Sequence, residues 1–199
     1  MPSLVGSEMC IRDSFKTLKL LYISRICDHK NLLFLIKSLK QLSNEINNKI
    51  ELNIYGFIEE EKYWEKCKNE IISISKFVKI TYRGVIQKID KTEVFQKHHF
   101  FILMSKSENF GHVIYESLSS GRPVIISDKT PWNEVGKKQC GYVVNLNNNN
   151  DLNAVFKTAL SIDQDKYLRM CKNALEFSKN FFLKQHYIDK FSFLFFQDK

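Results

Sequence analysis

Residues 99–127 read HFFILMSKSENFGHVIYESLSSGRPVIIS, and this stretch decides the fold. The apolar run His99–Met104 has the length and composition of a buried strand, and a polar turn follows it. Val113–Ser120 has the length of a short helix, Gly121 is a typical helix stop, and Pro123–Ser127 forms a second apolar run. The stretch therefore predicts a strand, a helix and a second strand, which is the repeating unit of a parallel sheet.

The same alternation continues on both sides of this unit. Short apolar runs of strand type occur at Leu18–Ile23, Ile50–Tyr55, Val78–Tyr82, His99–Met104, Pro123–Ser127 and Tyr142–Val144. Segments with helical periodicity or helix start signals occur at Asn31–Ile46, Glu60–Ser75, Val113–Ser120, from Asp151 onward, at Gln164–Lys179 and at Leu183–Phe196. The sequence thus predicts an α/β protein with a Rossmann-like parallel sheet flanked by helices, followed by C-terminal helices.

The composition is that of a globular protein. Of the 199 residues, 44% are hydrophobic and 26% are charged, which suits one domain with a real core. The five cysteines form no Cys-x-x-Cys pair, and we expect reduced thiols and a cytoplasmic location. No apolar run is long enough to predict a transmembrane helix.

The formal net charge of +8 favours anionic partners. The lysines are dispersed, and neither an arginine-rich arm nor zinc-finger spacing is present, so we do not expect nucleic acid to be the partner. A phosphorylated small molecule and an anionic membrane surface both remain compatible with this charge. The second would place the protein peripherally on the inner face of the membrane.

The two ends of the chain differ from its middle. Residues 1–14 lack periodicity and resemble translated sequencing-adaptor sequence, and we interpret them as a non-native segment. Residues 15–180 form the predicted Rossmann-like domain. Residues 181–199 are crowded with aromatic side chains that this domain alone would not bury, and we expect a helix there that packs on a second, N-terminal domain.

The turn inside residues 99–127 is the candidate binding site. Ligands of open α/β sheets bind beyond the carboxyl ends of the strands, where helix N-termini offer free N–H groups to anions. Gly111 would let the backbone approach a diphosphate closely. Glu116 falls about one turn into the helix, where its carboxylate would accept hydrogen bonds from a ribose diol.

Two motifs resemble those of a known family. Glu108 and Glu116 enclose seven residues that include Phe110-Gly111, and Gly121-x-Pro123 follows, as in the E-x7-E signature of retaining GT-B glycosyltransferases, chiefly glycosyltransferase family 4. The segment from Tyr22 to Asn31, with Arg25 and Lys30, resembles the family's loop after the first strand of the donor domain. The family's N-terminal acceptor-binding domain has no counterpart in this sequence.

The resemblance implies a role for each matched residue. Arg25 and Lys30 would neutralise the departing nucleoside diphosphate without a metal or other cofactor, and Glu108 would contact the transferred sugar; these are the implied catalytic residues. The donor, such as a UDP-sugar or GDP-sugar, would be bound by further residues: Glu116 at the ribose, the backbone at Asn109, Phe110 and Gly111, and the backbone at Gly84 and Val85 near the base. The acceptor would be a glycan or a lipid-linked molecule, as in cell-surface polysaccharide synthesis. Without the acceptor-binding domain, this donor-binding half would not catalyse the transfer.

Several other residues have simpler interpretations. We interpret His98 and His99 as structural, because no metal-type residue is suitably spaced from them, and Trp132 as a packing anchor. His112 could face either donor or solvent, and Cys27 lacks an evident base partner for a nucleophilic role. Two other functions remain open: a non-catalytic module that binds nucleotide or an anionic surface, and a sugar-nucleotide epimerase of the same fold.

Overall fold

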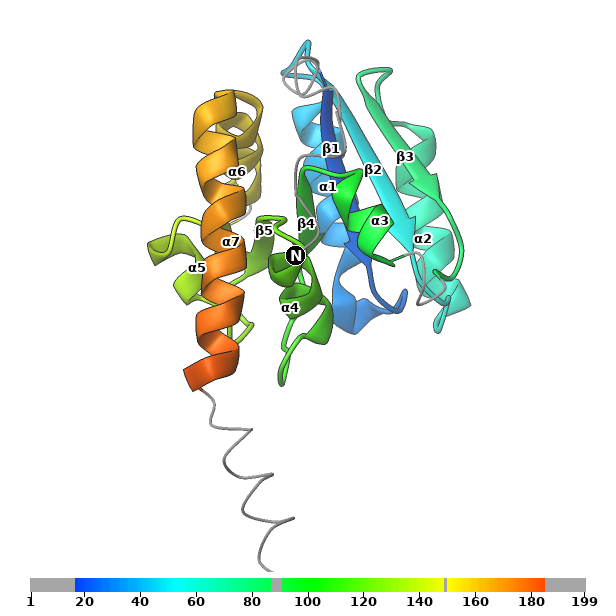
Figure 1. The fold of residues 1–199 in the computed structure, drawn as a ribbon. Helices are drawn as coiled ribbons and strands as arrows, with labels where there is room; N and C mark the ends of the chain where they lie inside the picture. The colour runs from blue at the N-terminus through cyan, green and yellow to red at the C-terminus, as the bar shows by residue number, and fades with distance from the viewer. Residues whose placement is uncertain (1–16, 87–90, 149, 185–199) are drawn as a thin grey trace, which may run out of the picture.

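The computed structural model describes residues 17–86, 91–148 and 150–184, and its centre is a six-stranded sheet (Figure 1). The strands are β1 (Thr17–Ile23), β2 (Lys49–Tyr55), β3 (Val78–Tyr82), β4 (Phe100–Leu103), β5 (Val124–Ser127) and β6 (Gly141–Val144). They pair in parallel in the order β3-β2-β1-β4-β5-β6. The predicted α/β fold with a Rossmann-like parallel sheet is confirmed.

Helices cover both faces of the sheet. They are α1 (Leu32–Leu42), α2 (Glu61–Ile72), α3 (Lys91–Gln96), α4 (His112–Ser119), α5 (Glu134–Lys137), α6 (Asp151–Leu160) and α7 (Gln164–Lys184), with a short 3-10 helix, η2 (Asp28–Lys30), before α1. Helix α1 packs against α2 and α6 on one face, and α4 packs against α7 on the other (Figure 1). Helix α4 therefore lies on the opposite face of the sheet from α1.

The predicted strands agree with the observed ones to within one residue at each end. Helix α1 begins one residue later than predicted because Asn31 has a left-handed backbone, with φ of 55°, and it ends at Leu42, four residues before the predicted end at Ile46. The sequence did not predict α3 or α5. Six and four residues are too short to show a helical period, and such helices depend on packing for their stability.

The predicted helix end at Lys179 is wrong, because α7 continues without a break to Lys184. No glycine or proline interrupts this part of the chain. Phe177 and Phe181, one turn apart, both pack against Trp132, with ring centroids 6.1 and 4.4 Å away. The domain boundary that we placed at residue 180 thus falls inside a helix. Residues 1–14, and the predicted helix beyond residue 184, lie outside the described residues.

The core lies around strands β1, β4 and β5. Every residue of β4 and β5 is buried, and so are most of those in β1, because helices cover both of their faces. Strand β2 instead alternates buried and partly exposed residues. The carboxyl ends of β1 and β4, which carry the candidate residues, are thus held in the best-packed part of the sheet.

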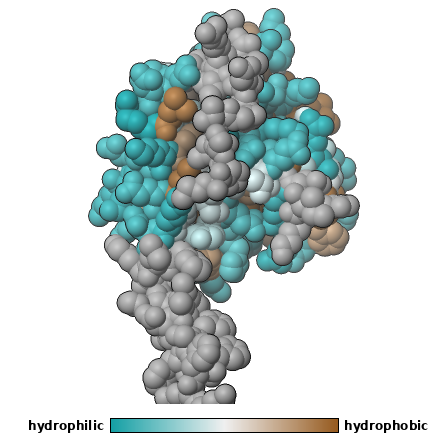
Figure 2. Space-filling view, viewed as in Figure 1, coloured by the Kyte–Doolittle hydropathy of each residue, from teal (hydrophilic) through white to brown (hydrophobic). Residues whose placement is uncertain are grey.

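The surface in Figure 2 is mostly hydrophilic, with small separate hydrophobic areas. None of the helices within the described ranges combines the length and the apolarity that crossing a bilayer requires. The four cysteines in the described residues are free thiols, and burial raises the pKa of Cys67 and of Cys140 to about 12. Such thiols are poor nucleophiles at neutral pH.

Candidate functional site

The loops that follow β1 and β4 meet at one edge of the sheet. The two strands are hydrogen-bonded neighbours, with Leu20 opposite Phe100, and they run in the same direction. Their carboxyl ends therefore open on the same side, although β4 comes about eighty residues later in the chain. The first loop contains Arg25 and Lys30, and the second contains Glu108.

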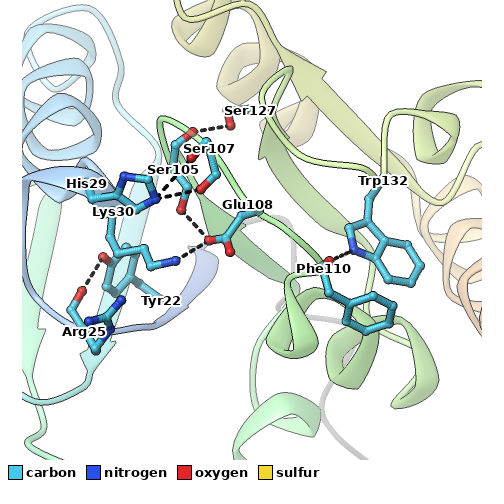
Figure 3. A network of polar contacts seen from close by, with 10 residues as sticks. All are labelled: Tyr22, Arg25, His29, Lys30, Ser105, Ser107, Glu108, Phe110, Ser127 and Trp132. Atoms are coloured by element: carbon cyan, nitrogen blue, oxygen red, sulfur yellow. Dashed lines mark hydrogen bonds and ion pairs between the residues drawn. The ribbon is translucent and has the colours of Figure 1, made fainter.

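Lys30 and Glu108 form an ion pair across this edge (Figure 3). The distance from Lys30 Nζ to Glu108 Oε1 is 2.5 Å, and only 13% and 11% of the two side chains are exposed. The hydroxyl of Ser105 donates to the same carboxylate oxygen at 2.7 Å, and the carbonyl of Ser105 accepts from the Ser127 hydroxyl at 2.6 Å. A chain of polar contacts thus connects the end of β5 to Glu108 and holds its carboxylate in place.

Further contacts join the same two loops. The N–H of Lys106 donates to the carbonyl of His29 at 2.9 Å, and the His29 ring contacts the carbonyl of Ser107 at 2.9 Å. Lys106 also forms an ion pair with Asp28. Because backbone groups take part on both sides, the separation of Lys30 and Glu108 is set by the backbone and not only by their own side chains.

Arg25 shares the loop with Lys30 but has a different partner. Its guanidinium contacts Glu59, which follows β2, at 2.6 Å, and 58% of the side chain is exposed. Cys27 lies between the two cations and is buried, and burial raises the pKa of its thiol. The structure therefore brings Lys30 to Glu108 and leaves Arg25 more exposed to solvent.

Glu116 lies in α4 and is bound by a residue that sequence analysis missed. Lys91, the first residue of α3, donates to both carboxylate oxygens of Glu116, at 3.1 and 3.0 Å. Lys30 precedes α1 and Glu116 lies within α4, so the two approach the carboxyl edge from opposite faces of the sheet. Nothing in the sequence around Lys91 indicates the contact, because its helix is short and its partner is 25 residues away.

The turn between Glu108 and α4 has a backbone conformation that favours glycine at position 111. Gly111 has φ of 78°, and a Cβ there would lie 2.8 Å from Ile114 Cδ1. The first hydrogen bond of α4 runs from the Ile114 N–H to the Gly111 carbonyl, so the N–H groups before it lie at the open end of the helix. Asn109 and His112 are exposed beside this end.

Trp132 holds this turn in place through its contacts with Phe110. The indole N–H donates to the carbonyl of Phe110, and the two rings pack edge to face with centroids 5.4 Å apart (Figure 3). Trp132 is only 1% exposed and also packs against Tyr115 and Phe181. These contacts are those of the packing anchor that the sequence predicted.

Gly84 and Val85 follow β3, two strands away from β1. The carbonyl of Gly84 accepts from the Gly56 N–H at 2.9 Å, which joins the loops after β2 and β3. Gly84 has φ of 75° and open space around its α-carbon, and Val85 is 68% exposed. Both residues are therefore accessible at the same carboxyl edge.

His98 and His99 lie at the other end of the sheet and have structural partners. His98 contacts Asn53 and the carbonyl of Val94, and His99 accepts from the N–H of Lys19 at 3.0 Å. Burial lowers the pKa of both, that of His99 to about 4, with a smaller effect of the Lys19 charge. Across the described residues, no three His, Cys, Asp or Glu side chains come together as metal ligands would.

The candidate site is an open edge and not a closed cavity. Hollows of about 370 and 520 Å³ lie beside α5 and α7, and none of the candidate residues lines them. A ligand at Lys30 and Glu108 would therefore rest on the sheet edge with one side uncovered.

Comparisons with known proteins agree with this fold. A search of curated protein sequences found no significant match. Among solved structures, a glycosyltransferase from Rickettsia africae is similar with a TM-score of 0.77 and 19% identity over 92% of this chain and 49% of that one. Anabaena HepE, solved in complex with UDP and glucose, gives a TM-score of 0.70 and 19% identity over 89% of this chain and 48% of that one.

A third structure contains a C-terminal domain alone. This domain of a group 1 glycosyl transferase from Francisella tularensis has a TM-score of 0.69 and 15% identity, and the match covers 82% of this chain and 85% of that one. The chain thus spans about half the length of the first two structures but most of this isolated domain. At such identities the likeness shows the fold alone.

The family profile described as "Glycosyl transferases group 1" matches residues 14–177, which include Arg25, Lys30, Glu108 and Glu116. Because this match covers most of the sequence, the chain belongs to the group 1 glycosyltransferase family.

Proposed function

We propose that this domain binds the nucleotide-sugar donor of a retaining glycosyltransferase that transfers a hexosyl group to a glycan or lipid-linked acceptor, in cell-surface polysaccharide synthesis. The observation that carries the proposal is the contact of Lys30 with Glu108, from motifs 78 residues apart in the sequence. A cation for the diphosphate and a carboxylate for the sugar stand side by side at the edge where α/β sheets bind ligands.

Lys30 is suited to hold a diphosphate. Its ammonium is largely buried and has one carboxylate partner, so an incoming phosphate oxygen would meet a poorly hydrated cation. Arg25 would add a second positive charge from the same loop after leaving Glu59, a change made easy by the exposure of that pair. Together they would stabilise the charge that grows on the leaving group as the glycosidic bond breaks.

Glu108 would then act on the sugar. Lys30 and Ser105 both contact Glu108 Oε1, so once the diphosphate contacts Lys30 the carboxylate keeps the Ser105 hydroxyl as a partner and offers Oε2 to sugar hydroxyls. Its negative charge would also favour the positive charge that develops at the anomeric carbon. Retention of configuration, like this role, comes from the family resemblance.

The nucleoside would extend toward α3 and the end of β3. Glu116 would accept from the ribose hydroxyls, and the accessible backbone of Gly84 and Val85 would contact the base. The open end of α4, at Gly111, would supply N–H groups to the phosphates. HepE, the similar Anabaena protein, was solved with UDP and glucose, which supports a donor of this class.

The open edge fits a donor site that another domain covers during the reaction. We propose that the acceptor binds to such a second, N-terminal domain and that the chain alone binds donor without turning it over. Exclusion of water and alignment of the acceptor hydroxyl both need the covered state.

Calorimetry tests the proposal directly. UDP, GDP and their glucose and mannose derivatives are titrated into the chain, and into Lys30→Ala and Glu116→Ala, with the fold of each checked by circular dichroism. We expect one nucleotide series to bind and each variant to lose roughly 10-fold or more in affinity, since each loses a charged hydrogen bond. Lys40→Ala is the control, because its partner Glu70 joins α1 to α2 on the opposite face from α4.

Two results would contradict the proposal. If no nucleotide binds to the folded chain, the donor assignment fails. If the folded chain binds no nucleotide but floats with anionic vesicles, it is instead a surface-binding module whose net charge of +8 contacts the anionic lipid.

A further inference from the structure

Lys91 forms an ion pair whose geometry differs from that of an ordinary surface contact. Its ammonium contacts both carboxylate oxygens of Glu116, at 3.1 and 3.0 Å, and joins α3 to α4. The two side chains are 28% and 38% exposed. The Glu93–Lys97 pair, in contrast, joins α3 only to the residue that directly follows it, and both side chains are more than 60% exposed.

Contact with both oxygens fixes the plane of the carboxylate. A partly exposed glutamate otherwise samples several rotamers, and a ligand that needs one orientation must select it at an entropic cost. Lys91 removes that cost because it contacts the carboxylate from a different helix. Glu116 is therefore already oriented before any ligand arrives.

The hydrogen-bonding capacity of Glu116 fits a diol. An ionised carboxylate offers about four lone-pair sites, two on each oxygen. Lys91 occupies one site on each oxygen, so one site on each remains. Two neighbouring acceptors of this kind match the two hydroxyl donors of a ribose.

We propose that Lys91 is a positioning residue that makes the site selective for ribonucleotides over deoxyribonucleotides. This inference rests on the proposed function, because Glu116 must face the nucleoside. Lys91 acts through Glu116. Its own charge contributes little to the binding of the phosphates, which contact Lys30 and Arg25. Its loss should therefore lower affinity for the ribose diol and leave the remainder of the nucleotide unaffected.

The test compares UDP with dUDP, or GDP with dGDP if guanine is the preferred base, by calorimetry. We expect the unmodified chain to bind the ribonucleotide about 10-fold tighter than the deoxyribonucleotide, the effect of one charged hydrogen bond. In Lys91→Met this ratio should fall below about threefold, because UDP loses more affinity than dUDP, which has only the 3′-hydroxyl to present to Glu116. Lys91→Arg keeps two donors for the carboxylate and should restore most of the ratio.

Lys40→Met is the matched control. Lys40 and Glu70 also form an ion pair between two helices, with 37% and 28% of their side chains exposed, but they join α1 to α2. This variant should keep the ribose preference of the unmodified chain and show a melting temperature similar to that of Lys91→Met. Lys91→Gln serves as a second variant if methionine at that position impairs folding.

The outcomes separate the two proposals. Binding of neither nucleotide by the unmodified chain would overturn the proposed function, and the inference with it. Nucleotide binding with the same ribose preference in Lys91→Met would overturn the inference alone. An equal loss for UDP and dUDP would also overturn it, because that pattern indicates a general effect of charge.

Discussion

Replacing Glu108 by glutamine should strengthen nucleotide binding, although Glu108 belongs to the proposed catalytic pair. Glutamine has nearly the same shape and keeps an amide oxygen for the Ser105 hydroxyl. What it removes is the negative charge that pairs with Lys30 when the site is empty. The diphosphate then no longer competes with an internal anion for the same ammonium.

The size of the effect follows from the contact distances. Glu108 lies 2.5 Å from Lys30 Nζ. A phosphate oxygen on the other side of the ammonium would lie about 2.8 Å from it, so the two anions would be roughly 5 Å apart. At an effective dielectric constant of about 20, two unit charges at that distance repel by ~3 kcal/mol. Screening by solvent and salt reduces this to about 1–2 kcal/mol, or roughly 5- to 30-fold in affinity.

Calorimetric titration of UDP, or of GDP if that series binds, measures this directly at fixed ionic strength. The unmodified chain, Glu108→Gln and the remote control Glu70→Gln are compared, and thermal melts verify that all three fold. Glu70 pairs with Lys40 and Lys37 on the opposite face from α4, so the control should leave affinity unchanged. Equal or weaker nucleotide binding in a folded Glu108→Gln would refute the idea that this pair competes with the diphosphate.

Three further predictions concern stability. Trp132→Phe removes the N–H that donates to the Phe110 carbonyl, and urea titration should show a loss of about 1–3 kcal/mol; no loss would mean that this carbonyl finds another partner. Gly56→Ala should lower the melting temperature far more than Gly84→Ala, because a Cβ at Gly56 would lie 1.8 Å from a backbone oxygen and one at Gly84 meets nothing within 4 Å; equal effects would contradict the steric reason. Burial lowers the pKa of His99 to about 4, so the unfolded chain takes up a proton as pH falls below about 6.5 while the folded chain does not. The contribution of His99 is therefore complete above that pH and falls by up to ~3 kcal/mol by pH 4, a slope that His99→Asn should reduce in urea titrations; an unchanged slope would refute the assignment.

The sequence predicted the fold because its signals are local. Each strand is a short apolar run, and each prominent turn has its own marker, such as Gly121 and Pro123 around the turn into β5. Short helices lack such signals, which is why α3 and α5 were missed. The end of α7 was misplaced because the contact of Phe181 with Trp132, which extends the helix, joins residues far apart in the chain.

The candidate site divides in a similar way. Motif spacing identified Lys30 and Glu108 separately, and only their types and their distances from the strands could be read from the sequence. Their contact depends on the pairing of β1 with β4, which no local pattern specifies. Lys91 could not be found at all, because neither its helix nor its partner is indicated by neighbouring residues.

The amino-acid order alone determined which segments become strands and helices and which charged side chains follow them. Those properties depend on apolar periodicity and on glycine and proline, which act over a few residues. Only the tertiary structure decided that β1 lies next to β4, that Lys30 contacts Glu108 and that Lys91 contacts Glu116. These contacts join residues 25 to 80 positions apart, and they form only when the packing of the whole sheet and its helices brings the two sides together.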